Sequence, residues 1–305
     1  MTQLPTGTVT LASIVEAMKA IAGSPPRARA SFAKGRCVHG TYAASDRAEE
    51  ITKSRSFTRP SRVLARFSLG GDREVANTDR VLRGFSFRLG GDQHRSDLLM
   101  QSAPVHFART LDQMLAFPKA RVSGPDGKPD MEEIRAFSAA NPETLRQANY
   151  IAAPPLDLGF AGTTYWGVHC FPATNLKGET RFIKFKVVPV GADVAPTQKA
   201  DVKSADFLLH DLENRITAGD VRFSVTALLD RPGDPTMDVT SRWSDEDSRE
   251  AVRLGTIVIT GVEAEDACDA AVFNPANLAD GIGHPPDEIF AARRAAYAIA
   301  QATRR

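Results

Sequence analysis

The stretch Asp287-Glu-Ile-Phe-Ala-Ala-Arg293-Arg-Ala-Ala-Tyr297, near the C-terminus, is the segment around which the rest of the chain can be arranged. Two prolines precede it, and proline suits the first turn of a helix. A carboxylate at the start also complements the positive helix end, so a helix is predicted to begin here. Arg293 and Tyr297 then lie one turn apart on the same face. A fixed cation lowers the pKa of a neighbouring phenol, and the resulting phenolate is a hard anionic metal ligand.

This arginine–tyrosine pair does not decide a function by itself. Most Arg-x-x-x-Tyr pairs on helices are surface contacts that stabilise the helix by roughly a few tenths of a kcal/mol. The metal-ligand interpretation therefore depends on whether other segments of the chain agree with it.

Length and charge limit the class of protein. The 305 residues are 42% hydrophobic, which suffices for a substantial core in one large domain or two small ones. The formal net charge is +1, from 38 basic and 37 acidic residues, so no overall field favours nucleic acid or an anionic membrane as partner. The N-terminus does not resemble a signal peptide, and no apolar run has the roughly 20 residues that a bilayer requires. These features predict a cytoplasmic, soluble protein.

The cysteines and histidines carry little evidence of a metal or disulfide site. Cys37, Cys170 and Cys268 are widely spaced, odd in number and without a CxxC pair, which argues against a disulfide framework and a zinc site. The histidines other than His106 show no pair at metal-ligand spacing. His169, within a predicted strand, is interpreted as a structural or exposed residue.

Hydrophobic patterns predict many short strands with helices inserted among them. Helices are predicted at Leu11–Ile21 and near Leu111, Met131–Ala139, Pro142–Ala148 and Asp206–Arg215. Strands are predicted at Cys37–Ala43, Val63–Ser68, Gly84–Leu89, Thr164–Phe171, Arg181–Val188, Val221–Leu228 and Thr256–Ile259. This order favours an antiparallel barrel in an α+β domain.

Several segments agree with the C-terminal one, in a single order along the chain. Arg29-Ala-Ser-Phe32-Ala-Lys-Gly35 resembles the Arg-x-x-His-Ala-Lys-Gly segment of haem catalases, and Ala65-Arg66-Phe67-Ser68 resembles their Val-Arg-Phe-Ser strand. Phe273-Asn-Pro-Ala-Asn-Leu-Ala-Asp-Gly281 is similar to the approach to the proximal helix, and Asp-x5-Arg-x3-Tyr to the proximal haem segment itself. The chain therefore resembles the catalase-related peroxidases, the short members of the haem catalase family.

The resemblance implies a fold, a cofactor and an assembly. The expected fold is α+β, a catalase-like eight-stranded antiparallel barrel with inserted and C-terminal helices that binds haem b. One catalase-core domain is expected over residues 1–305, with an N-terminal helix at 10–22, the barrel and inserted helices at 29–262, and the proximal haem helix at 286–304. Short family members further imply a homodimer.

Roles for individual residues follow from the same resemblance. Tyr297 would be the proximal ligand of the iron, with Arg293 and Asp287 supporting it. Arg29 and Arg66 would pair with the haem propionates, because a guanidinium binds a carboxylate through two charge-assisted hydrogen bonds. Two further residues are expected at the haem, Phe107 in contact with the cofactor and Ser68 near its distal side.

The chain departs from the family at the distal histidine, whose position is occupied by Phe32. A phenyl ring can neither accept nor donate a proton, and general acid-base help is typically worth roughly 100-fold to 10,000-fold in rate. Slow oxidation of the iron by hydrogen peroxide is therefore expected. The distal asparagine of large catalases falls on Gln101, which keeps an amide and so some capacity for hydrogen bonding.

A second departure places His106 where the family has the first of two phenylalanines, followed here by Phe107. Several interpretations remain open. His106 has taken over as the distal base, or it serves a substrate that enters from another angle. Alternatively, His106 is a hydrogen-bonded pocket residue and Phe32 is a drifted or engineered substitution.

Three functions are compatible with these residues. The first is a haem peroxidase that reduces hydrogen peroxide or an organic hydroperoxide while oxidising a small organic donor, with weak or absent catalase activity. The second is a catalase-fold enzyme that rearranges or dehydrates an organic hydroperoxide or another iron-binding substrate, as the catalase-related allene oxide synthases do. The third is a haem-binding protein without turnover, either natural or an inactivated variant.

Overall fold

The computed structural model describes residues 9–21, 29, 31–71, 75, 80–122, 128–153, 159–191, 206–219 and 221–302. Within these ranges, nine strands form one antiparallel sheet. The strands are β1 (Gly35–Ala44), β2 (Ser61–Leu69), β3 (Arg83–Leu89), β4 (Ser96–Gln101), β5 (Tyr165–Trp166), β6 (Phe171–Thr174), β7 (Thr180–Pro189), β8 (Arg222–Leu229) and β9 (Ala251–Val262).

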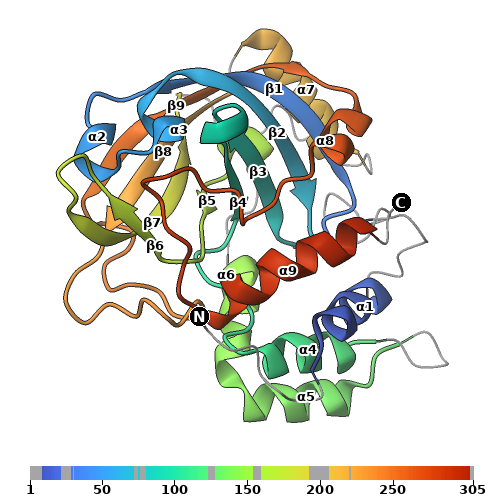
Figure 1. Ribbon diagram of the computed structural model, residues 1–305. Helices are drawn as coiled ribbons and strands as arrows, with labels where there is room; N and C mark the ends of the chain where they lie inside the picture. The colour runs from blue at the N-terminus through green and yellow to red at the C-terminus, as the bar shows by residue number, and fades with distance from the viewer. Residues whose placement is uncertain are drawn as a thin grey trace.

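The sheet closes into a barrel through the short strand β5. The strands follow the order β5-β4-β3-β2-β1-β9-β8-β7-β6, and β5 also pairs with β7. Eight strands therefore complete the ring, while β6 pairs with β7 outside it. This arrangement, visible in Figure 1, confirms the predicted eight-stranded antiparallel barrel. Strand β5 closes the ring through the pair Gln101–Trp166 with β4 and the pairs Tyr165–Val187 and Trp166–Lys186 with β7.

Aromatic side chains fill much of the barrel interior. Phe67 on β2 stacks on Phe85 of β3, with ring centroids 4.4 Å apart. Phe85 also contacts Phe223 of β8, with centroids 5.0 Å apart, so opposite sides of the ring meet in the centre. All three rings are fully buried, and burial of rings this size supplies a large hydrophobic stabilisation.

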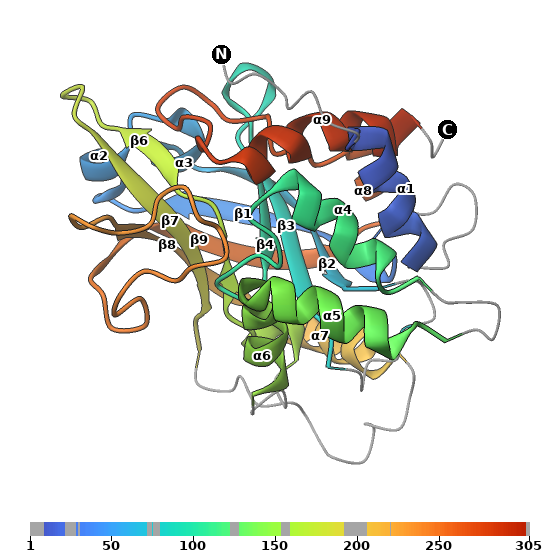
Figure 2. The ribbon, with the colours of Figure 1, turned by 90° about the horizontal axis from the view of Figure 1, so that it is seen from below.

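Helices cover the barrel mainly at one end. Their bounds are α1 (Leu11–Ile21), α2 (Ala48–Ile51), α3 (Arg55–Thr58), α4 (Leu111–Lys119), α5 (Met131–Ala140), α6 (Leu145–Ala152), α7 (Phe207–Ala218), α8 (Glu265–Ala271) and α9 (Glu288–Ala302). Helices α1, α4, α5, α6 and α9 gather below the barrel in Figure 1, and Figure 2 shows them from that side. Buried apolar side chains of α1, α4 and α9 form a separate cluster there, which includes Ile14, Met114 and Ile289.

The local predictions agree with the structure except where pairing is interrupted. The helix Leu11–Ile21 is confirmed with the same limits. The strand expected over Thr164–Phe171 is wrong as one element, because it is divided into β5 and β6, which pair with different parts of β7. Strand β4 and helix α8 were not predicted. Positions 22, 303 and 304, at the expected ends of the first and last helices, lie outside the described residues.

The expectation of no disulfide is also wrong. Cys37 on β1 and Cys268 on α8 form a disulfide, with Cα atoms 5.8 Å apart and a sequence separation of 231. Cys170 is free and buried. Sequence spacing carries no signal of the pair, because the barrel and the unpredicted helix α8 bring the two cysteines together.

Candidate functional site

A cavity of about 810 Å³ lies where the barrel meets the helices of its covered end. Its walls come from α1, β2, β3, β4, α4, α6 and α9. Of the ten site residues predicted from sequence, nine line it: Arg29, Phe32, Arg66, Ser68, Gln101, His106, Phe107, Arg293 and Tyr297. Asp287 is the exception and lies buried behind the wall. A volume of this size falls within the range of small-molecule and cofactor sites.

Helix α9 lines one wall of the cavity, and the Asp287 side chain caps its first turn. The side chain of Asp287 accepts a hydrogen bond from the backbone N–H of Phe290, 2.8 Å away. This contact satisfies one of the free amides of the first turn, as a carboxylate cap does. Further along the helix, the guanidinium carbon of Arg293 lies 6.0 Å from the ring centroid of Tyr297. The cap thus sets the start of the helix that presents both side chains to the cavity.

His169 connects Asp287 to Arg293. Its Nδ1 lies 2.9 Å from Asp287 Oδ2, and its Nε2 lies 2.9 Å from Arg293 Nη1. A guanidinium has only donors, so His169 Nε2 must accept and the ring proton must be on Nδ1, where it is donated to the carboxylate. The imidazole is therefore neutral, and the order of donation runs from Arg293 through His169 to Asp287.

The electrostatics of this relay agree with its geometry. Burial lowers the pKa of His169, and the Arg293 cation lowers it further, against the opposing effect of Asp287. Burial acts to raise the pKa of Asp287, but its contacts with His169, the Phe290 amide and Arg293 outweigh it, so the pKa of Asp287 is lowered. A neutral imidazole between a carboxylate and a guanidinium fixes the direction in which Arg293 points.

Phe32 lines the cavity from another wall, in an unusual backbone conformation. Its φ angle is 55°, a left-handed value that bulky residues rarely adopt. Arg66 holds this turn, because Nη1 donates to the carbonyl of Phe32 and Nη2 to the carbonyl of Ala33, both at 2.9 Å. A Cβ atom on Gly84 would lie 3.1 Å from the Phe32 ring and 2.6 Å from Ser68 Oγ, so only glycine leaves room for both. Such strain persists only where surrounding contacts impose it.

The amide of Gln101 is turned toward its own loop. Its Nε2 donates to the carbonyl of Val105 at 2.8 Å and lies 3.4 Å from that of Ala103. In this orientation the donor group of the amide is engaged within the protein, and the oxygen Oε1 remains as an acceptor. Ser68, the other polar residue predicted here, is buried on β2 beside Gly84.

His106 is buried and neutral. Its Nδ1 lies 2.9 Å from the carbonyl of Ala108 and 3.2 Å from the amide nitrogen of the same residue. Burial lowers the pKa of His106 to about 3, and the Arg293 cation contributes to the decrease. A general base works best with a pKa near the operating pH. The burial and these contacts favour the interpretation of His106 as a hydrogen-bonded pocket residue over its interpretation as the distal base. The charges that act on His106 include that of Arg293.

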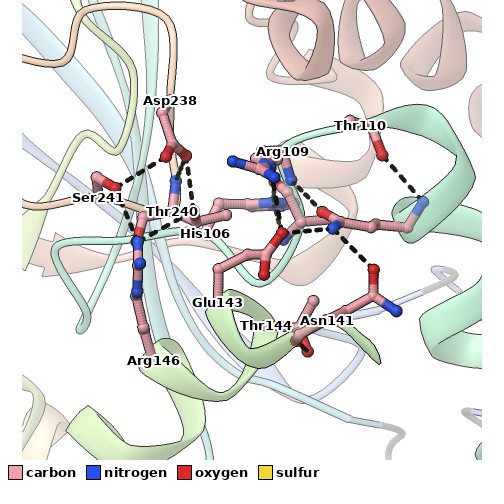
Figure 3. Close-up of polar contacts among 12 residues, drawn as sticks. His106, Arg109, Thr110, Asn141, Glu143, Thr144, Arg146, Asp238, Thr240 and Ser241 are labelled. Atoms are coloured by element: carbon pink, nitrogen blue, oxygen red, sulfur yellow. Dashed lines mark hydrogen bonds and ion pairs between the residues drawn. The ribbon is translucent and has the colours of Figure 1, made fainter. Parts of the chain in front are cut away.

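A polar network supports the loop that carries His106. The backbone N–H of His106 donates to the carbonyl of Val239, and the side chain of Asp238 accepts from Thr240 and Ser241. Arg146 on α6 donates to the carbonyl of Thr240 and the hydroxyl of Ser241. Figure 3 shows this network beside His106. The second phenylalanine position, Phe107, stacks on the His106 ring with centroids 4.4 Å apart.

The donor set of the cavity fits a haem. A phenol on one wall, from Tyr297, is a suitable ligand for ferric iron, and Arg29 and Arg66 are cations for carboxylates. Apolar side chains of α1, β4 and α4, including Val15, Met100 and Met114, make up much of the remaining lining. In the described ranges no cluster of three or more His, Cys, Asp or Glu residues is arranged to hold another metal ion.

The contacts of one residue of the site were not predicted from the sequence. His169 was interpreted as structural or exposed; it is buried between β5 and β6 and forms the centre of the relay to Arg293. The sequence carried no signal of these contacts, because Asp287 and Arg293 lie 118 and 124 positions away along the chain. None of the described helices is long and apolar enough to cross a membrane.

Comparisons with known proteins agree with this fold. A family model for catalases matches residues 7–305. The catalase-related peroxidase of Synechococcus elongatus is 28% identical over 306 residues, which cover 97% of this chain and 89% of that protein. The catalase-related peroxidase of Mycolicibacterium paratuberculosis is 28% identical over 305 residues, which cover 95% of this chain and 93% of that protein. The crystal structure of a fungal catalase superposes with a TM-score of 0.78 at 18% identity, over 92% of this chain and 60% of that chain.

Proposed function

The chain belongs to the catalase family, and we propose that it is a haem b peroxidase that reduces hydrogen peroxide or organic hydroperoxides and oxidises small organic donors. Catalase activity is weak or absent, because Phe32 replaces the distal histidine. The two relatives that are matched over 89% and 93% of their own length are named catalase-related peroxidases. This similarity supports the proposal that the chain is an oxidoreductase that acts on peroxide. The observation that carries the proposal is the cavity in which the predicted haem residues meet.

The haem, when bound, supplies redox chemistry at iron with a peroxide as oxidant. Tyr297 would hold the iron through its phenol oxygen, while Arg29 and Arg66 would hold the carboxylates and Phe107 would contact the porphyrin. Arg293, directed by His169, places a cation beside the phenol. These residues account for binding and orientation.

On the distal side of the proposed haem site, Phe32, Gln101 and His106 provide no efficient group for proton transfer. Phe32 has no titratable group, and the amide N–H of Gln101 is engaged with its own loop. His106 is held by Ala108 and has a pKa of about 3, so it is a poor base at neutral pH. Without a distal acid-base group we expect a rate with hydrogen peroxide roughly 100-fold to 10,000-fold below that of a family member with the histidine. Gln101 Oε1 and Ser68 Oγ are the polar groups left on that side to orient a peroxide.

An alternative function is favoured by the apolar lining. Phe32 and several residues of the helical wall make this cavity suited to an oily hydroperoxide: Ile14, Val15, Met18, Phe117 and Ile151. An enzyme that rearranges or dehydrates such a substrate needs no reducing donor and no distal base. It is distinguished by product formed from an organic hydroperoxide when no donor is present.

Stopped-flow absorbance of the ferric haem protein mixed with hydrogen peroxide tests the proposal. We expect the absorbance change that reports oxidation by hydrogen peroxide to be slow in the unaltered protein. In Phe32→His we expect its rate to be higher by about 100-fold or more. Phe117→His is the matched control, since Phe117 also lines the cavity but stands on α4. Haem uptake with steady oxidation of a phenolic donor supports the peroxidase. Haem uptake with neither donor oxidation nor hydroperoxide conversion contradicts both functions.

The assembly belongs to the same proposal. We expect the whole chain to act as one catalase-core domain and to form a homodimer, as the resemblance to short family members implies. Sedimentation equilibrium measures this, and a mass equal to that of a single 33.0 kDa chain at micromolar concentration would contradict the dimer.

A further inference from the structure

Helix α8 (Glu265–Ala271) directs acidic side chains at both cavity arginines. Asp269 Oδ1 lies 2.5 Å from Arg29 Nη2, and the same nitrogen lies 3.4 Å from the carbonyl of Cys268. Glu265 Oε2 lies 3.8 Å from Arg66 Nε. The arginines come from segments distant in sequence, yet one short helix contacts both. Each acidic side chain is about half exposed, whereas Arg66 is almost completely buried.

The disulfide joins this helix to the strand beside Arg66. Cys268 lies between the two acidic residues on α8 and is bonded to Cys37 of β1. Cys37 is the register partner of Arg66 in the β1–β2 ladder, and its backbone N–H donates to Glu265 Oε1 at 3.0 Å. Both cysteines are fully buried. The cross-link therefore sits at the point where α8, β1 and β2 meet the wall of the cavity.

A helix of this length needs an external support. The first turn of a helix is costly to form, and isolated helices shorter than about 12 residues are marginal in water. The covalent bond across a separation of 231 residues removes much of the freedom that α8 would otherwise have. A carboxylate that contacts a guanidinium reduces the number of orientations that this long side chain samples. Fixing α8 thus fixes the directions of Arg29 and Arg66.

We propose that α8 is a disulfide-fixed positioning element for the anion-binding arginines, with Asp269 orienting Arg29 and Glu265 orienting Arg66. The inference rests on the proposed haem function, because it assigns these arginines to the haem carboxylates. Reduction of the Cys37–Cys268 bond by a dithiol yields two thiols here and a cyclic disulfide in the reductant. The released helix holds the arginines less well, so haem is lost faster under reducing conditions.

The acidic residues are tested with the cross-link intact. Ferric protein loaded with haem b is mixed with excess apomyoglobin, and haem transfer is followed by absorbance. We expect Asp269→Asn to lose haem about threefold faster, since exposed ion pairs have modest energies. Asp269→Glu should restore most of the original rate, and the unfolding midpoint of the haem-free protein should change little in either variant. Equal rates in all three proteins would overturn the role of Asp269.

The cross-link is tested by removing it. We expect Cys37→Ser combined with Cys268→Ser to lose haem about tenfold faster, with Cys170→Ser as the matched control at the original rate. Protein unfolded and refolded with a dithiol should match the double variant and should recover after reoxidation. Haem bound and lost at the original rate in the double variant overturns this inference alone. If the original protein takes up no haem, the proposed function is overturned as well.

Discussion

The two walls of the cavity differ in how their polar groups are used. On the α9 wall, Arg293 donates to His169 and His169 to Asp287, so each donor has a buried acceptor. On the Phe32 wall, a phenyl ring faces the cavity and the amide of Gln101 donates to its own loop. The first wall orients a cation beside Tyr297, whereas Phe32 and Gln101 on the second present a phenyl ring and an amide, neither of which titrates.

From this difference we infer that, in the proposed function, holding the cofactor and transferring protons depend on separate residues. The relay behind α9 is complete and buried, as a network that positions a side chain must be. The Phe32 wall contains the strained turn at Phe32 and the Arg66 side chain that holds it. Under the proposed function, this turn occupies the distal position, and its phenyl side chain transfers no proton.

Replacing Tyr297 tests the α9 wall most severely. Tyr297→Phe removes the phenol oxygen that we propose as the iron ligand, so we expect haem content per chain to fall to the background of non-specific binding. Soret absorbance after desalting measures it. Tyr150→Phe, an exposed position outside the cavity lining, should leave the content unchanged. Undiminished haem with an unaltered ferric spectrum in Tyr297→Phe would reject Tyr297 as the ligand.

Breaking the relay should have a smaller effect on the same wall. His169→Leu removes the acceptor of Arg293 and the donor to Asp287, and loss of such supporting contacts typically costs roughly 10-fold to 100-fold in metal affinity. Haem titration of the purified apoprotein measures this change. His169→Gln can donate and accept at similar positions and should retain part of the affinity. If leucine and glutamine variants bind haem equally well, the relay does not position Arg293.

Crowding the distal wall should affect its packing more than its chemistry. Gly84→Ala puts a methyl group against Ser68 Oγ and the Phe32 ring, and overpacking of this kind costs about 1 to 3 kcal/mol. Chemical denaturation of the apoprotein measures the free energy of unfolding. Gly91→Ala, where nothing lies within 4 Å of the new Cβ, is the matched control. Equal stability of the two variants would show that Ser68 and the Phe32 ring shift to accommodate the methyl group at little cost in free energy.

His106 gives the smallest effect, a pH dependence of stability. The unfolded chain binds a proton at this residue below about pH 6.5, whereas the folded protein does so only near pH 3. Between these values the unfolded state binds more protons, so stability falls as the pH falls. His106→Phe should therefore reduce the slope of unfolding free energy against pH by up to about 1.4 kcal/mol per pH unit. An unchanged slope in the apoprotein would contradict the buried, neutral state.

Much of the fold could be predicted because its signals are local. Helix α1 was placed with its observed limits by apolar residues at helical spacing, and the long strand β7 was placed by alternation of apolar and polar residues. Strand β5, with two residues, carries no such pattern, although its pairing with β4 and β7 closes the barrel. Helix α8, with seven residues, has too few turns for a clear apolar stripe.

For the site, the sequence by itself determined the side chains offered to the cavity and their local spacing. Arg293 and Tyr297 share a face because they are four positions apart on one helix, and Phe32 excludes a distal imidazole at that position whatever the fold. Only the tertiary structure decided which groups meet across long separations: His169 with Arg293, Cys37 with Cys268, and Asp269 with Arg29. Such pairs depend on strand register and on barrel closure, which set distances that no local pattern records.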